Sequence, residues 1–80
     1  MSIDPVALIE FLEDALKGVQ EESARHWIRS AIQHLAEGSQ PRRVAAAAAC
    51  LHEAARCTSH PNYRNWLRSM AAHLEKEVWS

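Results

Sequence analysis

The chain has only two cysteines among its 80 residues, Cys50 and Cys57. If both lie on one helix, their Cα atoms are about 10 Å apart at ~1.5 Å per residue, beyond the roughly 7 Å that a disulfide spans. We therefore expect free thiols. Free thiols are typical of a reducing compartment, so we predict a cytoplasmic protein.

Long hydrophobic runs and an excess of one charge are also missing. No stretch approaches the roughly 20 apolar residues of a membrane-spanning helix. The opening MSIDPVALIE has an acid and a proline where a signal peptide has a basic segment. The formal net charge of −1 creates no overall field toward nucleic acid or an anionic membrane, and we expect no membrane association.

Motifs of catalysis are absent as well. The chain has no HExxH, no glycine-rich phosphate loop and no GxSxG, and its acids are spread along expected helices instead of being paired. Cys50, His52, Cys57 and His60 are poorly spaced for zinc, because His52 points roughly 200° away from Cys50 on one helix. We predict a protein that is not an enzyme and that binds no metal or cofactor.

What the sequence does have is helical periodicity in four segments. Turn residues separate them near Gly18, at 38–41 and at 58–61, and no segment alternates Val, Ile and Thr as a strand would. Connections of a few residues make sequential helices antiparallel neighbours. We therefore predict an all-α fold in a single domain, residues 1–80, with four antiparallel helices arranged as two αα-hairpins in a small helical bundle.

Local signals place the ends of these helices. The first is expected to run from Asp4, its N-cap, to about Lys17, with Gly18 as its stop. Glu21 and the acid after it favour the start of the second, which ends at Gly38. The third opens around SQPRRV and the fourth around SHPNY.

One phrase occurs twice: RHWIRSAIQHL at 25–35 returns as RNWLRSMAAHL at 64–74, thirty-nine residues later. The match predicts an internal duplication and a pseudo-twofold bundle in which Trp27 and Trp66 occupy equivalent buried positions. Two amphipathic helices that converged on similar residues are the alternative. Two units are fewer than the three or so that a solenoid needs, so a closed bundle is expected.

The third helix contains AAAAAC, which has high helix propensity and almost no side-chain bulk, so a neighbour must pack close to it. A domain this small buries only about 60% of its unfolded surface, and self-association is the usual supplement. We predict a homodimer or other homo-oligomer. The core stripe is expected to be Val44, Ala47, Ala48, Leu51, Ala54 and Ala55, and the predicted interface residues are Ala45, Ala46, Ala49 and, near the chain end, Trp79.

The arginines are the candidate binding residues. Arg25 has Glu21 and Glu22 within reach on its own helix, an ordinary solvated pairing. The other arginines of the repeated phrase have no acid three or four residues away. We therefore expect Arg29, Arg64 and Arg68 to pair with an acid on another helix or with an outside partner. Interhelical charges, or a patch for an acidic protein surface or a phosphate, both remain open. The candidate binding set is Arg25, Arg29, Arg42, Arg43, Arg64 and Arg68.

Two weaker patterns deserve a test. His34 and His73 would meet across a pseudo-symmetry axis as a pH sensor or metal pair, or simply pack as amphipathic residues. Arg42 and Arg43 open a helix after a tight turn, as in helix-turn-helix proteins. The helix then continues as AAAAAC, with nothing to contact base edges, so nucleic-acid binding is disfavoured.

These patterns favour a small, non-enzymatic interaction module, a regulatory or inhibitory accessory protein that occupies a surface of another protein. The alternative is a binder of an anionic ligand or nucleic acid through the arginine flanks of the second and fourth helices. A purely structural self-assembling unit is the third possibility.

Overall fold

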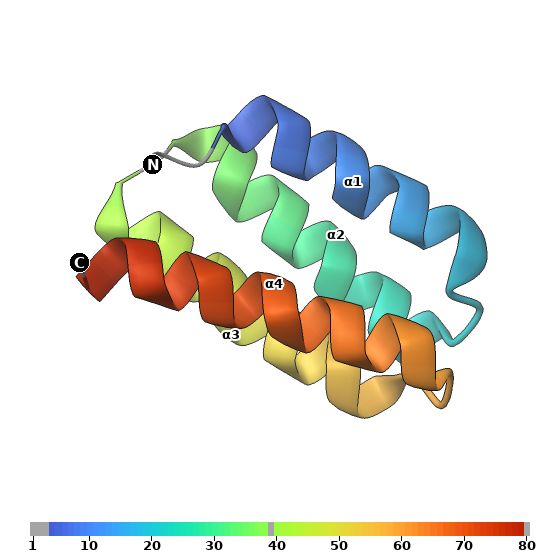
Figure 1. Cartoon of the computed structure of the whole chain (residues 1–80). Helices are drawn as coiled ribbons and strands as arrows, with labels where there is room; N and C mark the ends of the chain where they lie inside the picture. The colour runs from blue at the N-terminus through green and yellow to red at the C-terminus, as the bar shows by residue number, and fades with distance from the viewer. Residues whose placement is uncertain (1–3, 39, 80) are drawn as a thin grey trace.

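The chain forms four helices, which a computed structural model describes over residues 4–38 and 40–79, without the side chains of residues 5 and 77–79. The helices are α1 (Pro5–Gly18), α2 (Glu22–Glu37), α3 (Pro41–Cys57) and α4 (Pro61–Trp79), as Figure 1 shows. No strand occurs in the described ranges. The predicted all-α fold of four helices is confirmed.

Proline marks where α1, α3 and α4 begin. All three prolines of the chain, Pro5, Pro41 and Pro61, are the first residue of a helix, where the missing N–H costs nothing and the fixed φ is already helical. The side chain of Asp4 accepts a hydrogen bond from the N–H of Val6 at 3.0 Å and caps α1.

Gly18 ends α1 at the predicted place. It does not adopt the left-handed conformation, and the residue after α1 is the extended Val19, whose N–H bonds to the carbonyl oxygen of Ala15 at 2.9 Å. A Cβ atom at residue 18 would overlap the outer end of the Tyr63 side chain from α4. The absence of a side chain at Gly18 therefore lets the Tyr63 ring lie against α1.

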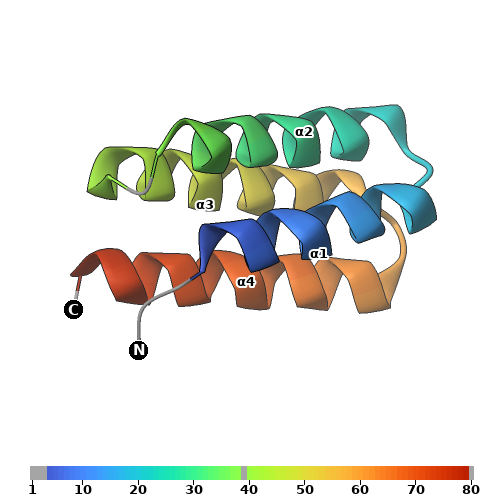
Figure 2. The same cartoon turned by 90° about the horizontal axis from the view of Figure 1, so that it is seen from above.

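The four helices stand around one core in chain order, so that α1 and α4 lie beside each other and complete the ring (Figures 1 and 2). The two ends of the chain lie at one end of the bundle, and the loops 19–21 and 58–60 lie at the other. α3 packs closely against α2 and α4, and α1 packs against α2. The radius of gyration is 11.3 Å, close to the roughly 12 Å of a compact domain of this length.

The alanine-rich helix α3 lies at the centre of this packing. Of its predicted core stripe, Val44 is half-buried and the other members are buried. The close neighbours that its small side chains required are α2 and α4. The buried members are Ala47, Ala48, Leu51, Ala54 and Ala55.

The two tryptophans are half-buried at the edge of the core, which corrects the prediction of two buried rings. The next residue of each helix, Ile28 after Trp27 and Leu67 after Trp66, has no exposed surface and fills the centre instead. A helix turns by about 100° per residue, so both positions cannot face the axis. The tryptophans nevertheless share one level of burial.

Buried positions recur thirty-nine residues apart in both halves of the chain. Six buried residues, Cys50 among them, have a half-buried or exposed residue at this offset. At six pairs, both residues are buried although their identities often differ. The pairs are Leu8 and Ala47, Leu12 and Leu51, Ala15 and Ala54, Val19 and Thr58, Ile28 and Leu67, and Leu35 and Leu74.

Candidate functional site

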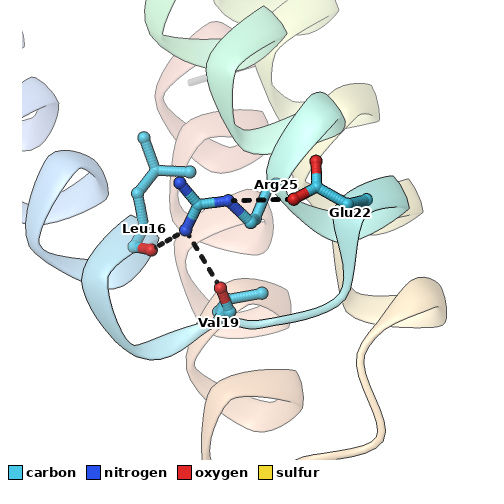
Figure 3. Close-up of polar contacts among 4 residues, drawn as sticks. All are labelled: Leu16, Val19, Glu22 and Arg25. Carbon is cyan, nitrogen blue, oxygen red and sulfur yellow. Dashed lines mark hydrogen bonds and ion pairs between the residues drawn. The ribbon is translucent and has the colours of Figure 1, made fainter.

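Arg25 caps the C-terminal end of α1 from the neighbouring helix α2 (Figure 3). Its Nη1 group donates hydrogen bonds to the carbonyl oxygens of Leu16 and Val19, the latter at 3.1 Å, and its Nε lies 3.9 Å from a carboxylate oxygen of Glu22. Carbonyl groups in the last turn lack partners within the helix and form the negative end of its dipole. The expected pairing with Glu22 is present but long, and Glu21 bonds to a different segment, so Arg25 mainly serves α1.

Arg64 makes the matching bond in the second half of the chain. Its Nη2 group donates to the carbonyl oxygen of Thr58 at 3.0 Å, as Arg25 donates to Val19. Each acceptor lies six residues before its arginine and is the C-cap residue of the preceding helix. The buried Nε of Arg64 has no partner among the described residues. We expected Arg64 to need a partner on another helix or outside the chain. One of its partners is the carbonyl group of Thr58, between α3 and α4.

Glu21 joins the two loops at this end of the bundle. Its carboxylate accepts hydrogen bonds from the N–H of Ser59 at 3.0 Å, from the Ser59 hydroxyl at 2.8 Å and from the hydroxyl of the buried Thr58 at 3.2 Å. These bonds favour the charged form, and those from Ser59 are the main reason that the pKa of Glu21 falls from 4.5 to about 2. This polar cluster therefore fastens the loop 19–21 to the loop 58–60.

Two of the remaining candidate arginines lie far from Arg25 and Arg64. Arg42 and Arg43 open α3 at the opposite end of the bundle from the loops 19–21 and 58–60. Arg43 forms an ion pair with Glu37. Arg29, Arg42 and Arg68 are exposed, and none pairs with an acid whose side chain is described.

The predicted interface on α3 is only partly open to solvent. Ala45 and Ala49 are exposed and Ala46 is half-buried, so a flat alanine surface remains on the outside of the bundle. The side chain of Trp79, the fourth predicted interface residue, lies outside the described residues.

One histidine makes a polar contact between two helices. His52 of α3 bonds to Glu75 of α4. Both cysteines are free, and burial raises the pKa of the Cys50 thiol. His34 is half-buried with an unpartnered Nδ1, whereas His73 is exposed, and no contact joins them in the described structure. No cluster of three metal-binding side chains occurs among residues with described side chains.

A groove that the sequence did not predict runs between α1 and α4. It consists of two hollows, of about 400 and about 220 Å³, that share Phe11 of α1 as the ridge between them. Phe11 is 58% exposed, which is unusual for a large aromatic side chain. The larger hollow is lined by Phe11, Asp14, Ala15, Asn62, Tyr63 and Trp66. The smaller is lined by Asp4, Leu8, Phe11, Met70, His73 and Leu74, together with Ala7.

Large side chains explain why this α1–α4 groove is open. The residues thirty-nine positions away lie on α3 and α2, which pack closely together. On α3, Cys50 corresponds to Phe11 of α1, and Ala47 corresponds to Leu8. On α2, Ala24 corresponds to Tyr63 of α4, and Ala31 corresponds to Met70. All four of these smaller residues are buried, so the small residues close one seam and the large ones hold the other apart.

Comparisons with known proteins add no relative. No protein-family model matches the chain, and no curated protein or solved structure matches it either. Among the described residues, no helix has both the length and the apolar character required to cross a bilayer.

Proposed function

We propose that this protein is a helical interaction module that binds another protein through the α1–α4 groove. The exposed ring of Phe11 between two apolar hollows is the observation that carries the proposal. Apolar side chains that gather in one exposed hollow are a feature of protein interaction sites. The two hollows follow one another along α1 and α4, which suits a segment of protein.

The polar groups support a role in binding without chemistry. Glu21, Arg25 and Arg64 hold helix ends and loops together, and His52 links α3 to α4. These groups have structural partners within the chain, so we infer a regulatory or inhibitory accessory protein that acts by occupying a surface of its partner.

We further propose that the chain is an internal duplication of antiparallel hairpins, α1–α2 and α3–α4, related by a pseudo-twofold axis. The matched burial thirty-nine residues apart supports this proposal, as do the equivalent bonds of Arg25 and Arg64. The C-caps agree too: the N–H of Thr58 bonds to Ala54 at 3.2 Å, as that of Val19 bonds to Ala15. In this arrangement α1 corresponds to α3 and α2 corresponds to α4. The open α1–α4 groove is then the counterpart of the closed contact between α2 and α3.

The alternative, an anionic ligand or nucleic acid bound through the arginine flanks, has less support. Arg25, Arg43 and Arg64 hold partners within the chain, which leaves Arg29, Arg42 and Arg68 available. Binding to nucleic acid would weaken steeply with salt, whereas binding in an apolar groove would respond little.

We also propose that the protein forms a homo-oligomer in the cytoplasm. The exposed Ala45 and Ala49 offer a flat surface to a second subunit, and the free thiols Cys50 and Cys57 suit a reducing compartment.

The test is capture of partner proteins from a lysate of the source cells by immobilised wild-type, Phe11→Glu and Val6→Glu proteins. Val6 is a matched control, because it lies on the same helix, is 63% exposed and does not line the groove. Circular dichroism confirms that each variant folds. We expect mass spectrometry to find the same partners with wild type and Val6→Glu, and to lose them with Phe11→Glu. Partners that persist with Phe11→Glu contradict the proposal.

A further inference from the structure

The spacing of the two hollows identifies the shape of the segment that fits the groove. On α1, the residues that line the two hollows are centred about six positions apart, which corresponds to about 9 Å of helix. On α4, they are centred about nine positions apart, which corresponds to about 13 Å. The mean of the two helices is a separation of about 11 Å between the hollows.

A helix presents side chains at this distance on one face. Residues i and i+7 of an α-helix are about 10.5 Å apart and point in nearly the same direction. Same-face residues of an extended strand are roughly 7 or 13 Å apart, so a helix matches the mean separation of the two hollows more closely. Apolar anchors at such spacing are the usual mode by which a groove binds a helix.

The charge of α1 identifies the chemistry of that helix. Residues 4–18 contain four carboxylates and one lysine. Two of the carboxylates, Asp4 and Asp14, line the smaller and the larger hollow respectively, whereas α4 contributes the uncharged Asn62 and a histidine. Asp14 has only an exposed contact with Lys17 at 3.5 Å, so it is free to meet a cation from a partner.

We propose that the α1–α4 groove binds one amphipathic helix of a partner protein, with large apolar residues at i and i+7 on either side of Phe11 and with Lys or Arg beside Asp14. This inference rests on the proposed interaction function and specifies its ligand. The two anchors occupy the hollows, and the acidic flank of α1 selects a basic helix over an acidic one.

The experiment is selection of helical peptides of about 15 residues, ~22 Å long, from a displayed random library against the full-length protein. We expect enriched sequences to share apolar residues seven positions apart and an excess of Lys and Arg. In amide NMR spectra of the labelled protein, an enriched synthetic peptide should shift the signals of α1 and α4. A selection that yields no binder, or binders without this spacing and charge, overturns the inference.

Charge reversal tests the acidic flank with a matched control. Asp14→Lys should weaken binding of the enriched peptide by roughly two- to fivefold, the usual effect of an exposed ion pair, and added salt should reduce the difference. Glu13→Lys makes the same charge change about 160° away from the groove on α1 and should leave binding nearly unchanged. Equal weakening by both variants overturns the role of Asp14.

The outcomes also separate this inference from the broader proposal. If no helical peptide binds the groove while Phe11→Glu still abolishes capture of cellular partners, the interaction function stands and the helical ligand is wrong. If self-association of the protein is lost with Phe11→Glu and kept with Val6→Glu, a second copy of the chain occupies the groove, and the inference is overturned.

Discussion

Glu21 and Ser59 fasten the loops 19–21 and 58–60 together. The carboxylate, between α1 and α2, accepts bonds from both the N–H and the hydroxyl group of Ser59, between α3 and α4. The two residues are thirty-eight positions apart, so this link closes one end of the whole bundle.

The link should make stability depend on pH. The pKa of Glu21 is about 2 in the folded chain and 4.5 ordinarily, so its contribution is complete above pH 4.5 and is lost as the pH falls from 4.5 toward 2. Urea denaturation at pH 7, 4 and 3 should show a steeper loss for wild type than for Glu21→Gln. The other carboxylates titrate in both proteins, and parallel pH curves would disprove the assignment.

Gly18→Ala should destabilise the fold, although alanine normally favours a helix by about 0.5–1 kcal/mol over glycine. The new Cβ atom overlaps the ring of Tyr63, and such overpacking costs about 1–3 kcal/mol. In a Tyr63→Ala background the same change should be neutral or stabilising. Thermal or chemical denaturation of the four proteins of this cycle gives the answer, and an unchanged sign in both backgrounds refutes the contact.

The two tryptophans should contribute about equally and less than a core leucine. Both rings are half-buried, so Trp27→Ala and Trp66→Ala should each cost about 1–3 kcal/mol, below the 2–5 kcal/mol expected for the fully buried Leu51→Ala. Chemical denaturation measures all three. A large loss at one tryptophan and almost none at the other would count against the pseudo-twofold arrangement.

The arginines should separate into structural and free groups. Arg25→Gln and Arg64→Gln remove charged hydrogen bonds to C-terminal carbonyl groups and should each cost about 1–2 kcal/mol. Arg29→Gln and Arg68→Gln, the matched exposed pair, should cost less than about 0.5 kcal/mol. Urea unfolding monitored by circular dichroism compares them, and similar losses in both pairs would show that Arg29 and Arg68 also have structural partners.

Ala49→Glu should shift an oligomer toward monomer without unfolding it. Ala49 is exposed on α3, so the glutamate side chain fits the single subunit and clashes only in a subunit interface. Sedimentation velocity at high micromolar concentration measures the change. Wild-type protein that sediments as a monomer would exclude the alanine interface.

The helices were predictable because their ends depend on local chemistry. Proline at a first helical position and a capping Asp4 act over a few residues, and the structure places the helix starts there. The partner of Arg25 was not predictable in the same way. Spacing rules find partners on the same helix, whereas its acceptors Leu16 and Val19 lie at the end of the preceding one.

The groove was missed because it depends on side-chain volume at a contact between helices far apart in the chain. The signal was nevertheless present in the sequence, at the same offset as the repeated phrase. At matched positions, the α1–α4 contact has Tyr63, Met70 and Phe11 where the α2–α3 contact has the smaller Ala24, Ala31 and Cys50. Comparing the sizes of matched residues, and not only their identities, would have located the open seam.

The alanine-rich helix α3 also determines where the chain can change. Ala47, Ala48, Ala54 and Ala55 have almost no exposed surface between two close neighbours, so even one added methylene group has no room there. In a scan of all single substitutions, we expect these chemically plain positions to tolerate the fewest alternatives and exposed arginines such as Arg29 to tolerate the most. Drift among descendants of this chain would then change the exposed arginines first and keep these four buried alanines longest.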